Sequence, residues 1–375
     1  MTDPHPQISI VVPALNEAPN LPPLAEQIAA ALDGRAYEVI VVDDDSRDDT
    51  PAVAARLAQS HPLRLIVRSG ARDGLSGAVL RGFAEARGQF LVVMDADLQH
   101  PPHKLPELLA PLEKGDADFV IGSRYMPGGS MAQKWGAFRK LNSRVATSLA
   151  RPFAGRTTDP MSGFFALRRD TYQRAQRLTP LGYKIGLELM CKSRVRNVRE
   201  VPIHFAERTR GESKLNVKEQ FRYLEHLSRL YDFTFPRASP IAKFLIVIAL
   251  SWLVGFSLFH LLLATATGVV PAMFAAYLGV IAVTAAFHVR YVRTQREFIV
   301  RPRPWLDFAL ISAAELCACV LSAWWVLRRL ESPATTYELF FIPAAVATVV
   351  RYALRKELLQ DVRGLRKELR KDELT

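Results

Sequence analysis

Long apolar runs in the second half of the chain constrain its fold more than any other feature. From Phe244 to Leu263 the sequence reads FLIVIALSWLVGFSLFHLLL, with His260 as its one titratable residue. A run of about 20 such residues is long enough to cross ~30 Å of hydrocarbon as a helix. The fourth run ends in Arg351, which indicates either a tilted span with a snorkelling arginine or a re-entrant segment. We predict four membrane spans, at residues 241–263, 269–289, 305–327 and 338–354.

The charges between these runs predict their orientation. The link between the first two spans, ATATG, is uncharged, whereas residues 290–303 carry five arginines and the tail, residues 356–375, is rich in Lys and Arg. By the positive-inside rule we expect a multi-pass membrane protein with both termini in the cytosol. Arg328 and Arg329 fall on the opposite side and weigh against this orientation. The start, MTDPHPQ, has no basic n-region or apolar h-region, so we expect no cleaved signal peptide.

Composition narrows the possible partners. The 375 residues include 49 Lys and Arg against 37 Asp and Glu, a formal charge of +12. Because the basic surplus lies beside the apolar runs, anionic lipid explains it better than nucleic acid, and we expect no nucleic-acid partner. Three cysteines form neither a disulfide framework nor a zinc-ligand spacing, so we expect no structural metal.

Residues 1–235 follow a different pattern, in which short β-branched runs alternate with amphipathic stretches. Such a βαβα pattern is typical of a mostly parallel α/β sheet that binds its ligands at the carboxyl ends of the strands. The proline-punctuated stretch 233–240 marks the boundary with a transmembrane domain at residues 236–355. We expect strands at 8–15, 37–46, 63–69, 89–99 and 118–125, and helices at 21–32, 50–60, 75–88 and 103–115.

Acidic residues crowd the end of the second expected strand, in VVDDDSRDDT. Asp43 is a candidate for recognising a base and ribose at this strand end. The alternative is an N-cap for the next helix, with Asp49 or Thr50 ahead of Pro51 at the first helical position.

The fourth expected strand ends in VVMDADLQHPP, which places Asp95 and Asp97 two residues apart. Close carboxylates repel each other and suit Mg²⁺ or Mn²⁺, hard cations that prefer oxygen ligands and share phosphates with their substrates. Gln99 offers a further oxygen. The alternative is a turn that the Asp side chains close by bonding to the backbone.

The order of the motifs in residues 8–235 resembles that of family 2 glycosyltransferases of GT-A fold, and within them the dolichyl-phosphate (polyprenyl-phosphate) mannose synthases. The motifs are VVPALNE, VVDDDSRDDT, VVMDADLQHPP, GSRY, TDPMSGFFALRR, GYKIGLELM and ERTRGESKL. The resemblance implies a Rossmann-like α/β GT-A domain at residues 1–235, with interfacial helices, followed by an all-α transmembrane domain of four helices.

The same resemblance implies ligands and the residues that hold them. It implies GDP-mannose as donor, Mg²⁺ or Mn²⁺ as cofactor, and a polyprenyl (dolichyl) phosphate as acceptor. Asp97 and Gln99 match the metal ligands. The loop ERTRGESKL places Arg210 and Lys214 over the donor diphosphate, unless it is merely a solvated charge run. The positions that match the donor nucleotide site are Pro13, Leu15, Glu17, Val41, Asp43, Asp95 and Ala96.

A helix expected at about 134–151 has one apolar face with basic residues beside it, as interfacial helices do. Arg139 and Ser143 lie four residues apart and so share a side of this helix. The resemblance places the acceptor phosphate against these two residues and Arg124, which together with Asp97 are the expected catalytic residues. The alternative is an ordinary amphipathic helix that packs on the domain. A second such helix, at about 217–233, lies at the interface or serves as a buried connector.

The predicted reaction is metal-dependent, inverting transfer of mannose to the lipid phosphate. A phosphate monoester has a second pKa of about 6, so no side-chain base is strictly needed. Two alternatives remain: the same chemistry with UDP-glucose or another sugar nucleotide, and a nucleotide-binding lipid-sugar flippase or scaffold. Asp159 either orients the acceptor phosphate or the sugar, or caps a turn, and Glu188 has no derived role. Glu315, costly in hydrocarbon, is either functional or paired with a nearby Arg or His.

Overall fold

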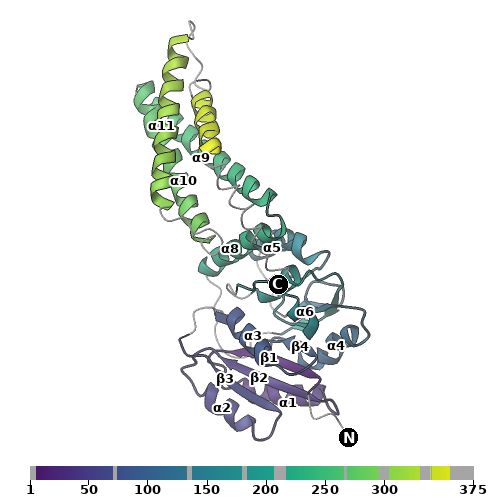
Figure 1. Ribbon diagram of the computed structural model, residues 1–375. Coiled ribbons are helices and arrows are strands. Elements are labelled where there is room, and N and C mark those ends of the chain that lie inside the picture. The colour runs from purple at the N-terminus through teal and green to yellow at the C-terminus, as the bar shows by residue number, and fades with distance from the viewer. Residues whose placement is uncertain are drawn as a thin grey trace, which may run out of the picture. The chain divides into compact units, whose positions relative to one another are not determined.

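The computed structural model describes residues 6–70, 74–132, 137–179, 184–206, 217–265, 268–294, 304–329, 338 and 340–354. Within helices, the side chains of residues 137–143, 217–221, 270, 288–294, 304, 305, 307 and 329 lie outside the description. The chain divides into two compact units, Met1–Thr234 and Phe235–Thr375 (Figure 1).

The first unit is built on a seven-stranded sheet in the order β3-β2-β1-β4-β7-β5-β8. β7 runs antiparallel to both of its neighbours, and the other neighbouring strands are parallel. The predicted mostly parallel sheet is therefore confirmed. The strands are β1 (Ile8–Ala14), β2 (Tyr37–Asp43), β3 (Leu63–Val67), β4 (Phe90–Val93), β5 (Phe119–Ser123), β7 (Phe165–Arg168) and β8 (Val198–Pro202).

Helices cover both faces of this sheet. Alternation along β1 sends Ile10 and Val12 into a core with α1, α2 and α4, and Val11 into a second core on the opposite face. The helices of the first face are α1 (Leu21–Ala31), α2 (Thr50–Leu57) and α4 (Leu105–Glu113). Those of the second are α3 (Gly74–Glu85), α5 (Ala137–Ala154), α7 (Ile185–Lys192) and α8 (Val217–Thr234).

The structure corrects the expected elements in two respects. β4 ends at Val93 rather than continuing to residue 99, because the chain turns there and Leu98 has a positive φ of 61°. The short strands β7 and β8 were not expected, nor was the two-stranded pair of β6 (Ser130–Met131) and β9 (His204–Phe205). Also unexpected were the helices η1 (Pro102–Lys104), α6 (Arg169–Gln173) and α7.

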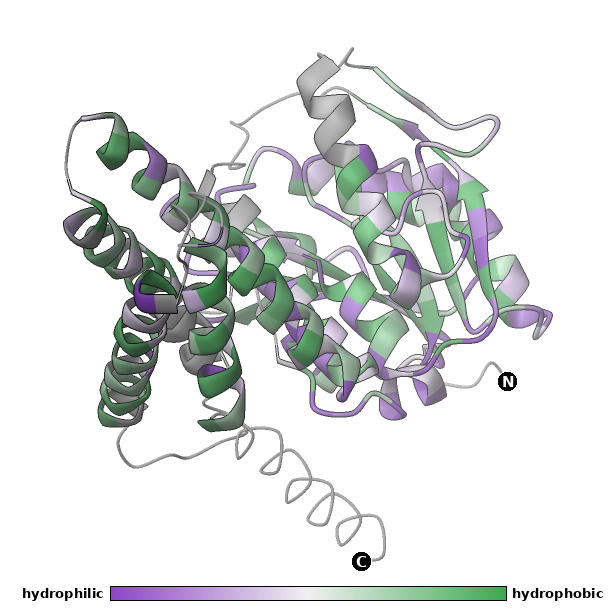
Figure 2. Cartoon of the chain, turned by 90° about the horizontal axis from the view of Figure 1, so that it is seen from above, coloured by the Kyte–Doolittle hydropathy of each residue, from purple (hydrophilic) through white to green (hydrophobic). Residues whose placement is uncertain are grey.

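The second unit is helical and apolar along most of its length (Figure 2). It contains α9 (Ala238–Ala264), α10 (Val269–Thr294), α11 (Pro304–Arg329) and the apolar helix Phe340–Leu354. Within the described residues, α9 and the segment Phe308–Arg328 are long and apolar enough to cross a membrane. The apolar part of α10, Pro271–Phe287, and the helix Phe340–Leu354 are shorter than these two. The count of four spans therefore stays a prediction.

A buried ion pair joins α11 to the last helix. Nε and Nη2 of Arg351 both bond the carboxylate of Glu315, and both side chains are buried. The predicted pairing of Glu315 with a nearby basic residue is confirmed. The alternative of a snorkelling Arg351 is wrong, because a guanidinium with a buried carboxylate partner has no need to reach the membrane surface.

At the amino ends of β1 and β2, one buried carboxylate holds three segments together. Glu38 accepts hydrogen bonds from Ser9 Oγ and from the backbone N–H of Arg87, both at 2.7 Å, and pairs with Arg64 Nε at 3.0 Å. Burial alone would raise the pKa of Glu38, but these hydrogen bonds and the arginine lower it overall.

We therefore expect Glu38→Gln to destabilise the protein by about 1–3 kcal/mol near neutral pH. Since the folded pKa lies below the ordinary value of 4.5, this stabilisation is present above that pH and is lost as the pH falls through the folded pKa. Thermal unfolding in detergent at neutral and acidic pH measures the difference. Glu26→Gln, at an exposed position of α1, is the matched control. Equal Tm values for Glu38→Gln and wild type at pH 7 would contradict the role of this network.

Candidate active site

The loops that follow β1 and β2 are tied to each other at the carboxyl edge of the sheet. The backbone N–H of Asn16 donates to Ser46 Oγ at 2.8 Å, and that of Glu17 donates to Thr50 Oγ1 at 2.8 Å. The structure thus brings Pro13, Leu15, Glu17 and Asp43 to one edge. Val41 lies two residues back in β2, with its side chain in the core that α1, α2 and α4 cover.

Asp43 is a buried carboxylate with capacity left for a ligand. Its Oδ2 accepts the N–H of Ser46 at 3.1 Å, while its Oδ1 is buried without a hydrogen-bond partner among the described residues. Buried acceptors of this kind are rare and call for a partner. The N-cap alternative is correct in position for Asp49, which is the N-cap residue of α2, but Asp49 makes no side-chain cap hydrogen bond. Asp48 Oδ1 instead accepts the N–H of Thr50 at 3.0 Å, and Asp43 bonds Ser46 rather than the start of the helix.

Backbone strain gathers at the same edge. Asn16, Asp45 and Leu98 have φ values of 58°, 67° and 61°, in the left-handed region that residues other than glycine seldom adopt. They follow β1, β2 and β4 respectively. Strained backbone persists where the surrounding structure fixes it, and such positions concentrate at functional sites.

After β4 the chain forms a turn that presents Asp97 and Gln99. The N–H of Gln99 donates to Asp97 Oδ1 at 3.1 Å, so the expected Asp-closed turn is present. Gln99 Nε2 donates to the carbonyl of Ala206 at 3.0 Å, which leaves its Oε1 as the atom available to a cation. The described residues contain no group of three or more His, Cys, Asp or Glu side chains placed to hold a metal. A metal here would therefore depend on Asp97, Gln99 and oxygens of the substrate.

The side chain of His100 stabilises this turn through a hydrogen bond to its backbone. It is buried, and its Nδ1 accepts the N–H of Asp95 at 3.0 Å. Burial lowers the pKa of His100 to about 4, so the ring is neutral near pH 7 and carries its proton on Nε2. Gly163 packs closely here, because a Cβ at that position would lie 3.3 Å from Asp95 Oδ2 and from His100 Cε1. Loop 157–164 therefore lies directly against Asp95.

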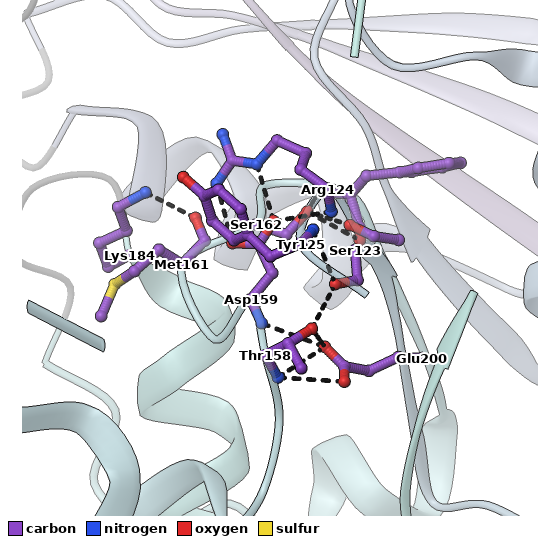
Figure 3. A network of polar contacts seen from close by, with 11 residues as sticks. Ser123, Arg124, Tyr125, Thr158, Asp159, Met161, Ser162, Lys184 and Glu200 are labelled. Atoms are coloured by element: carbon purple, nitrogen blue, oxygen red, sulfur yellow. Dashed lines mark hydrogen bonds and ion pairs between the residues drawn. The ribbon is translucent and has the colours of Figure 1, made fainter. Parts of the chain in front are cut away.

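The same loop holds Arg124, at the end of β5, through a buried ion pair (Figure 3). Nε and Nη2 of Arg124 donate to the two oxygens of Asp159 at 2.7 and 2.8 Å, and its backbone N–H donates to Oδ2 at 3.1 Å. The guanidinium carbon lies 5.4 Å from the ring centre of Tyr125 and 5.2 Å from that of Phe205. Burial alone would lower the pKa of Arg124, but Asp159 raises it overall, so the arginine stays charged.

Glu200, from β8, fixes the start of this loop (Figure 3). Its carboxylate accepts hydrogen bonds from the backbone N–H groups of Thr158 and Asp159 at 2.9 and 3.1 Å, and from Thr158 Oγ1 at 2.9 Å. Thr158 Oγ1 also lies 2.8 Å from Ser123 Oγ. Glu200 thus holds Asp159 in the position from which it bonds Arg124, and no sequence motif predicted this role of Glu200.

Lys184 completes the charged cluster. Its Nζ donates to the carbonyl of Met161 at 2.6 Å, two residues beyond Asp159. Burial lowers the pKa of Lys184 to about 7; the charge of Arg124 also lowers it, while Asp159 and Asp95 oppose the shift. The sequence pattern did not single out this lysine.

The other expected site residues are only partly within the description. Arg139 and Ser143 belong to α5 by backbone, but their side chains lie outside the described residues, as do Arg210 and Lys214 altogether. The structure therefore brings together, at the carboxyl ends of the parallel strands β2, β4 and β5, the residues Asp43, Asp95, Ala96, Asp97, Gln99 and Arg124.

Helices α5 and α8 form a pair with an exposed apolar surface. Tyr223 and Tyr231 of α8 donate their hydroxyls to carbonyls of α5, at 2.9 and 3.0 Å. Val145 and Leu224 are 50% and 52% exposed, although other residues of both helices pack into the core. The alternative that α5 packs on the domain is thus confirmed, and its location at the membrane interface stays a prediction.

Glu188 has a structural role. It accepts hydrogen bonds from Lys192 Nζ at 2.6 Å and from the N–H of Thr179 at 2.8 Å, and lies 3.6 Å from Nε2 of His226 on α8. This buried cluster stabilises the packing of α7 against α8.

Comparison with known proteins identifies the family. Residues 9–174 match the model of glycosyl transferase family 2. The dolichol-phosphate mannosyltransferase of Pyrococcus furiosus is 44% identical over 244 residues, which are 64% of this chain and 68% of that one. That of Mycosarcoma maydis is 43% identical, over 66% of this chain and 86% of its own length. That of Saccharomyces cerevisiae is 39% identical, over 68% of this chain and 98% of its own length.

A solved structure, glucosyl-3-phosphoglycerate synthase from Mycobacterium tuberculosis in complex with Mg²⁺ and UDP, is 23% identical with a TM-score of 0.48, over 61% of this chain and 79% of that one. At this level of similarity its ligands are not transferable to this chain. The family match and the sheet agree with the expected GT-A glycosyltransferase fold. The chain belongs to glycosyl transferase family 2 and, within it, to the dolichol-phosphate mannosyltransferases.

Proposed function

We propose that this glycosyltransferase transfers mannose from GDP-mannose to a membrane polyprenyl phosphate, with a divalent metal and with inversion at the anomeric carbon. The observation that carries the proposal is that one loop contacts both halves of the site. Gly163 of loop 157–164 packs on Asp95, at the donor end, and Asp159 of the same loop holds Arg124, at the acceptor end. The relatives named above act on dolichol phosphate and mannose, which supports this choice of acceptor and sugar.

Asp43 supports a nucleotide whose base donates hydrogen bonds. Its Oδ1 is buried and unpartnered within the described part of the chain. Guanine presents two adjacent N–H donors on its Watson–Crick edge, whereas uracil presents one. An ionised carboxylate only accepts hydrogen bonds, so Asp43 suits guanine, which offers more N–H groups than uracil. Pro13 and Leu15 flank this position at the end of β1.

The turn after β4 fits a divalent cation. Asp97 and Gln99 each present an oxygen, and Mg²⁺ is commonly held by one or two protein oxygens together with substrate phosphates. When bound, such an ion neutralises charge on the departing diphosphate. Arg210 and Lys214 would add positive charge to the same group.

The acceptor phosphate is assigned to Arg124, Arg139 and Ser143. Arg124 donates Nε and Nη2 to Asp159. Within the described residues, Nη1 is therefore the guanidinium nitrogen that remains for a phosphate oxygen. Arg139 and Ser143 lie four residues apart on α5. The exposed apolar residues of α5 and α8 suit the boundary between headgroups and acyl chains, where a polyprenyl phosphate carries its charge.

The reaction is a single displacement. A phosphate oxygen of the acceptor forms a bond to the anomeric carbon as the bond from that carbon to the GDP oxygen breaks, and GDP departs with the electron pair. The phosphate is already ionised near neutral pH, so no proton has to be removed. Catalysis therefore rests on placing the two anions and stabilising charge. An α-linked donor yields a β-linked lipid product.

The test is transfer of labelled sugar by the purified full-length protein in detergent. GDP-mannose and UDP-glucose are compared, with polyprenyl phosphate as acceptor, in the presence of Mg²⁺, Mn²⁺ or EDTA. We expect metal-dependent mannolipid from GDP-mannose. Glucolipid from UDP-glucose instead would overturn the donor, and nucleotide binding without any turnover would favour a flippase or scaffold.

Removing either proposed metal ligand should abolish most of this activity. We expect Asp97→Asn and Gln99→Ala to lower kcat by about 100-fold or more, because charge on the leaving diphosphate would lose its stabilisation. Initial rates at saturating donor across a Mg²⁺ titration measure the loss. Asp116→Asn, at an exposed turn, is the matched control. Wild-type rates in EDTA would refute the metal role.

Truncating the α5 contacts should weaken the acceptor selectively. We expect Arg139→Met and Ser143→Ala each to raise the KM for polyprenyl phosphate, by about 10- to 100-fold for the arginine, with the KM for GDP-mannose unchanged. Steady-state kinetics with each substrate varied in turn measure both constants. Arg151→Met, an exposed arginine of the same helix, should leave both constants at wild-type values. An equal rise in the donor KM would contradict the assignment.

A further inference from the structure

We infer that Glu200 is a positioning residue for the acceptor half of the transfer reaction. Its carboxylate holds the backbone of Asp159, and through Asp159 it sets the direction in which Arg124 meets the acceptor phosphate. This inference rests on the proposed function, which assigns the acceptor phosphate to Arg124.

Three donors of loop 157–164 converge on one oxygen of Glu200. Its Oε1 accepts the N–H of Thr158 and Thr158 Oγ1, both at 2.9 Å, and the N–H of Asp159 at 3.1 Å. Its Oε2 accepts the N–H of Thr158 as well, at 3.0 Å. Hydrogen bonds to an ionised carboxylate are about twice as strong as those between neutral groups. Because two of the three donors are backbone groups, Glu200 fixes the course of the main chain at Asp159.

The pairing of two strands places Glu200 close to the start of the Arg124 side chain. β8 lies parallel to β5, with Pro202 opposite Ser123, and Glu200 precedes Pro202 by two residues. Arg124 directly follows Ser123, the last residue of β5. Thr158 Oγ1 lies 2.8 Å from Ser123 Oγ, so the start of the loop is bonded to both strands (Figure 3).

Asp159 transmits this position to Arg124. The buried carboxylate of Asp159 accepts Nε and Nη2 of Arg124 at 2.7 and 2.8 Å, and its Oδ2 also accepts the backbone N–H of Arg124 at 3.1 Å. A planar guanidinium bonded through two nitrogens to one carboxylate has a fixed direction. A shift in the backbone of Asp159 therefore turns the guanidinium, and a misplacement of about 1 Å costs about 100-fold in rate.

The far half of the loop is bonded to the sheet independently of Glu200. Ser162 Oγ donates to the carbonyl of Gly122 at 2.7 Å. The next residue, Gly163, packs on Asp95 at the proposed donor end. Loss of the Glu200 contacts should therefore disturb the acceptor end and leave the donor end in place. A residue that only stabilised the fold would lower the amount of folded enzyme without changing either KM.

The experiment measures kcat and both KM values for the full-length wild type, Glu200→Met, Glu200→Gln and the control Arg199→Met. Methionine keeps the length of the side chain without its acceptors, whereas glutamine keeps one oxygen that can take the place of Oε1. Arg199 is the exposed neighbour of Glu200 on β8. GDP-mannose and polyprenyl phosphate are varied in turn, and folding of each variant is checked by thermal unfolding in detergent.

The expected effect is confined to the acceptor. We expect Glu200→Met to lower kcat/KM for polyprenyl phosphate by about 10- to 100-fold with an unchanged KM for GDP-mannose, because a displaced Arg124 costs about this much. Glu200→Gln should stay within about fivefold of wild type, since it loses the charge but keeps the main acceptor oxygen. Arg199→Met should match wild type.

Two further variants test the route through the loop. Adding Glu200→Met to Asp159→Asn should lower kcat/KM for the acceptor by less than about threefold more, because residues of one network are not additive. Thr158→Val removes the hydroxyl donor alone and carries the test if Glu200→Met does not fold. It should raise the KM for polyprenyl phosphate by about 3- to 10-fold with the KM for GDP-mannose unchanged.

The outcomes separate this inference from the proposed function. Wild-type constants in folded Glu200→Met, or an equal rise in both KM values, would overturn the inference alone as long as wild type makes mannolipid. Full additivity of Glu200→Met and Asp159→Asn would also overturn it. Absence of transfer by wild type with any donor would overturn the proposed function and the inference together.

Discussion

The buried ion pair between Arg124 and Asp159 is the interaction on which the rest of the site depends. A buried carboxylate without a partner is costly, so Asp159 forces Arg124 into one orientation, between Tyr125 and Phe205. Asp159 is itself held by Glu200 of β8, at the far edge of the sheet. Strands at one end of the sheet thus determine the position of the proposed acceptor arginine, and loop 157–164 connects it with Asp95 at the proposed donor end.

Strand ends could be read from the sequence because they depend on local pattern. Apolar periodicity located β1 to β5 and α1 to α4, and acids that follow a strand in a parallel sheet must gather at one edge. Asp43, Asp97 and Gln99 lie there as expected. The motif resemblance also named the family correctly, because those motifs lie in contiguous stretches.

What the sequence could not give were contacts between segments far apart in the chain. β7 has only four residues, the last of which is the first of two arginines, and β8 reads VREVP with two adjacent charged residues, so neither resembles a buried strand. Asp159 and Arg124 are 35 residues apart, and Lys184 and Met161 are 23 apart, so no spacing rule connects them. The pairing of Glu315 with Arg351 was open for the same reason until packing brought the two helices together.

For the four predicted spans, the pair of Glu315 and Arg351 has a consequence for the biogenesis of the protein. Placing a lone arginine or carboxylate at the centre of a membrane helix costs about 2.5–3.5 kcal/mol on insertion scales. Each of the two helices carries that penalty until the opposite charge is beside it, and α11 is synthesised before the helix that bears Arg351. If the predicted third and fourth spans both cross the membrane, the helix 340–354 is therefore a poor insertion signal by itself and a better one next to α11, and we expect the two to insert as a hairpin.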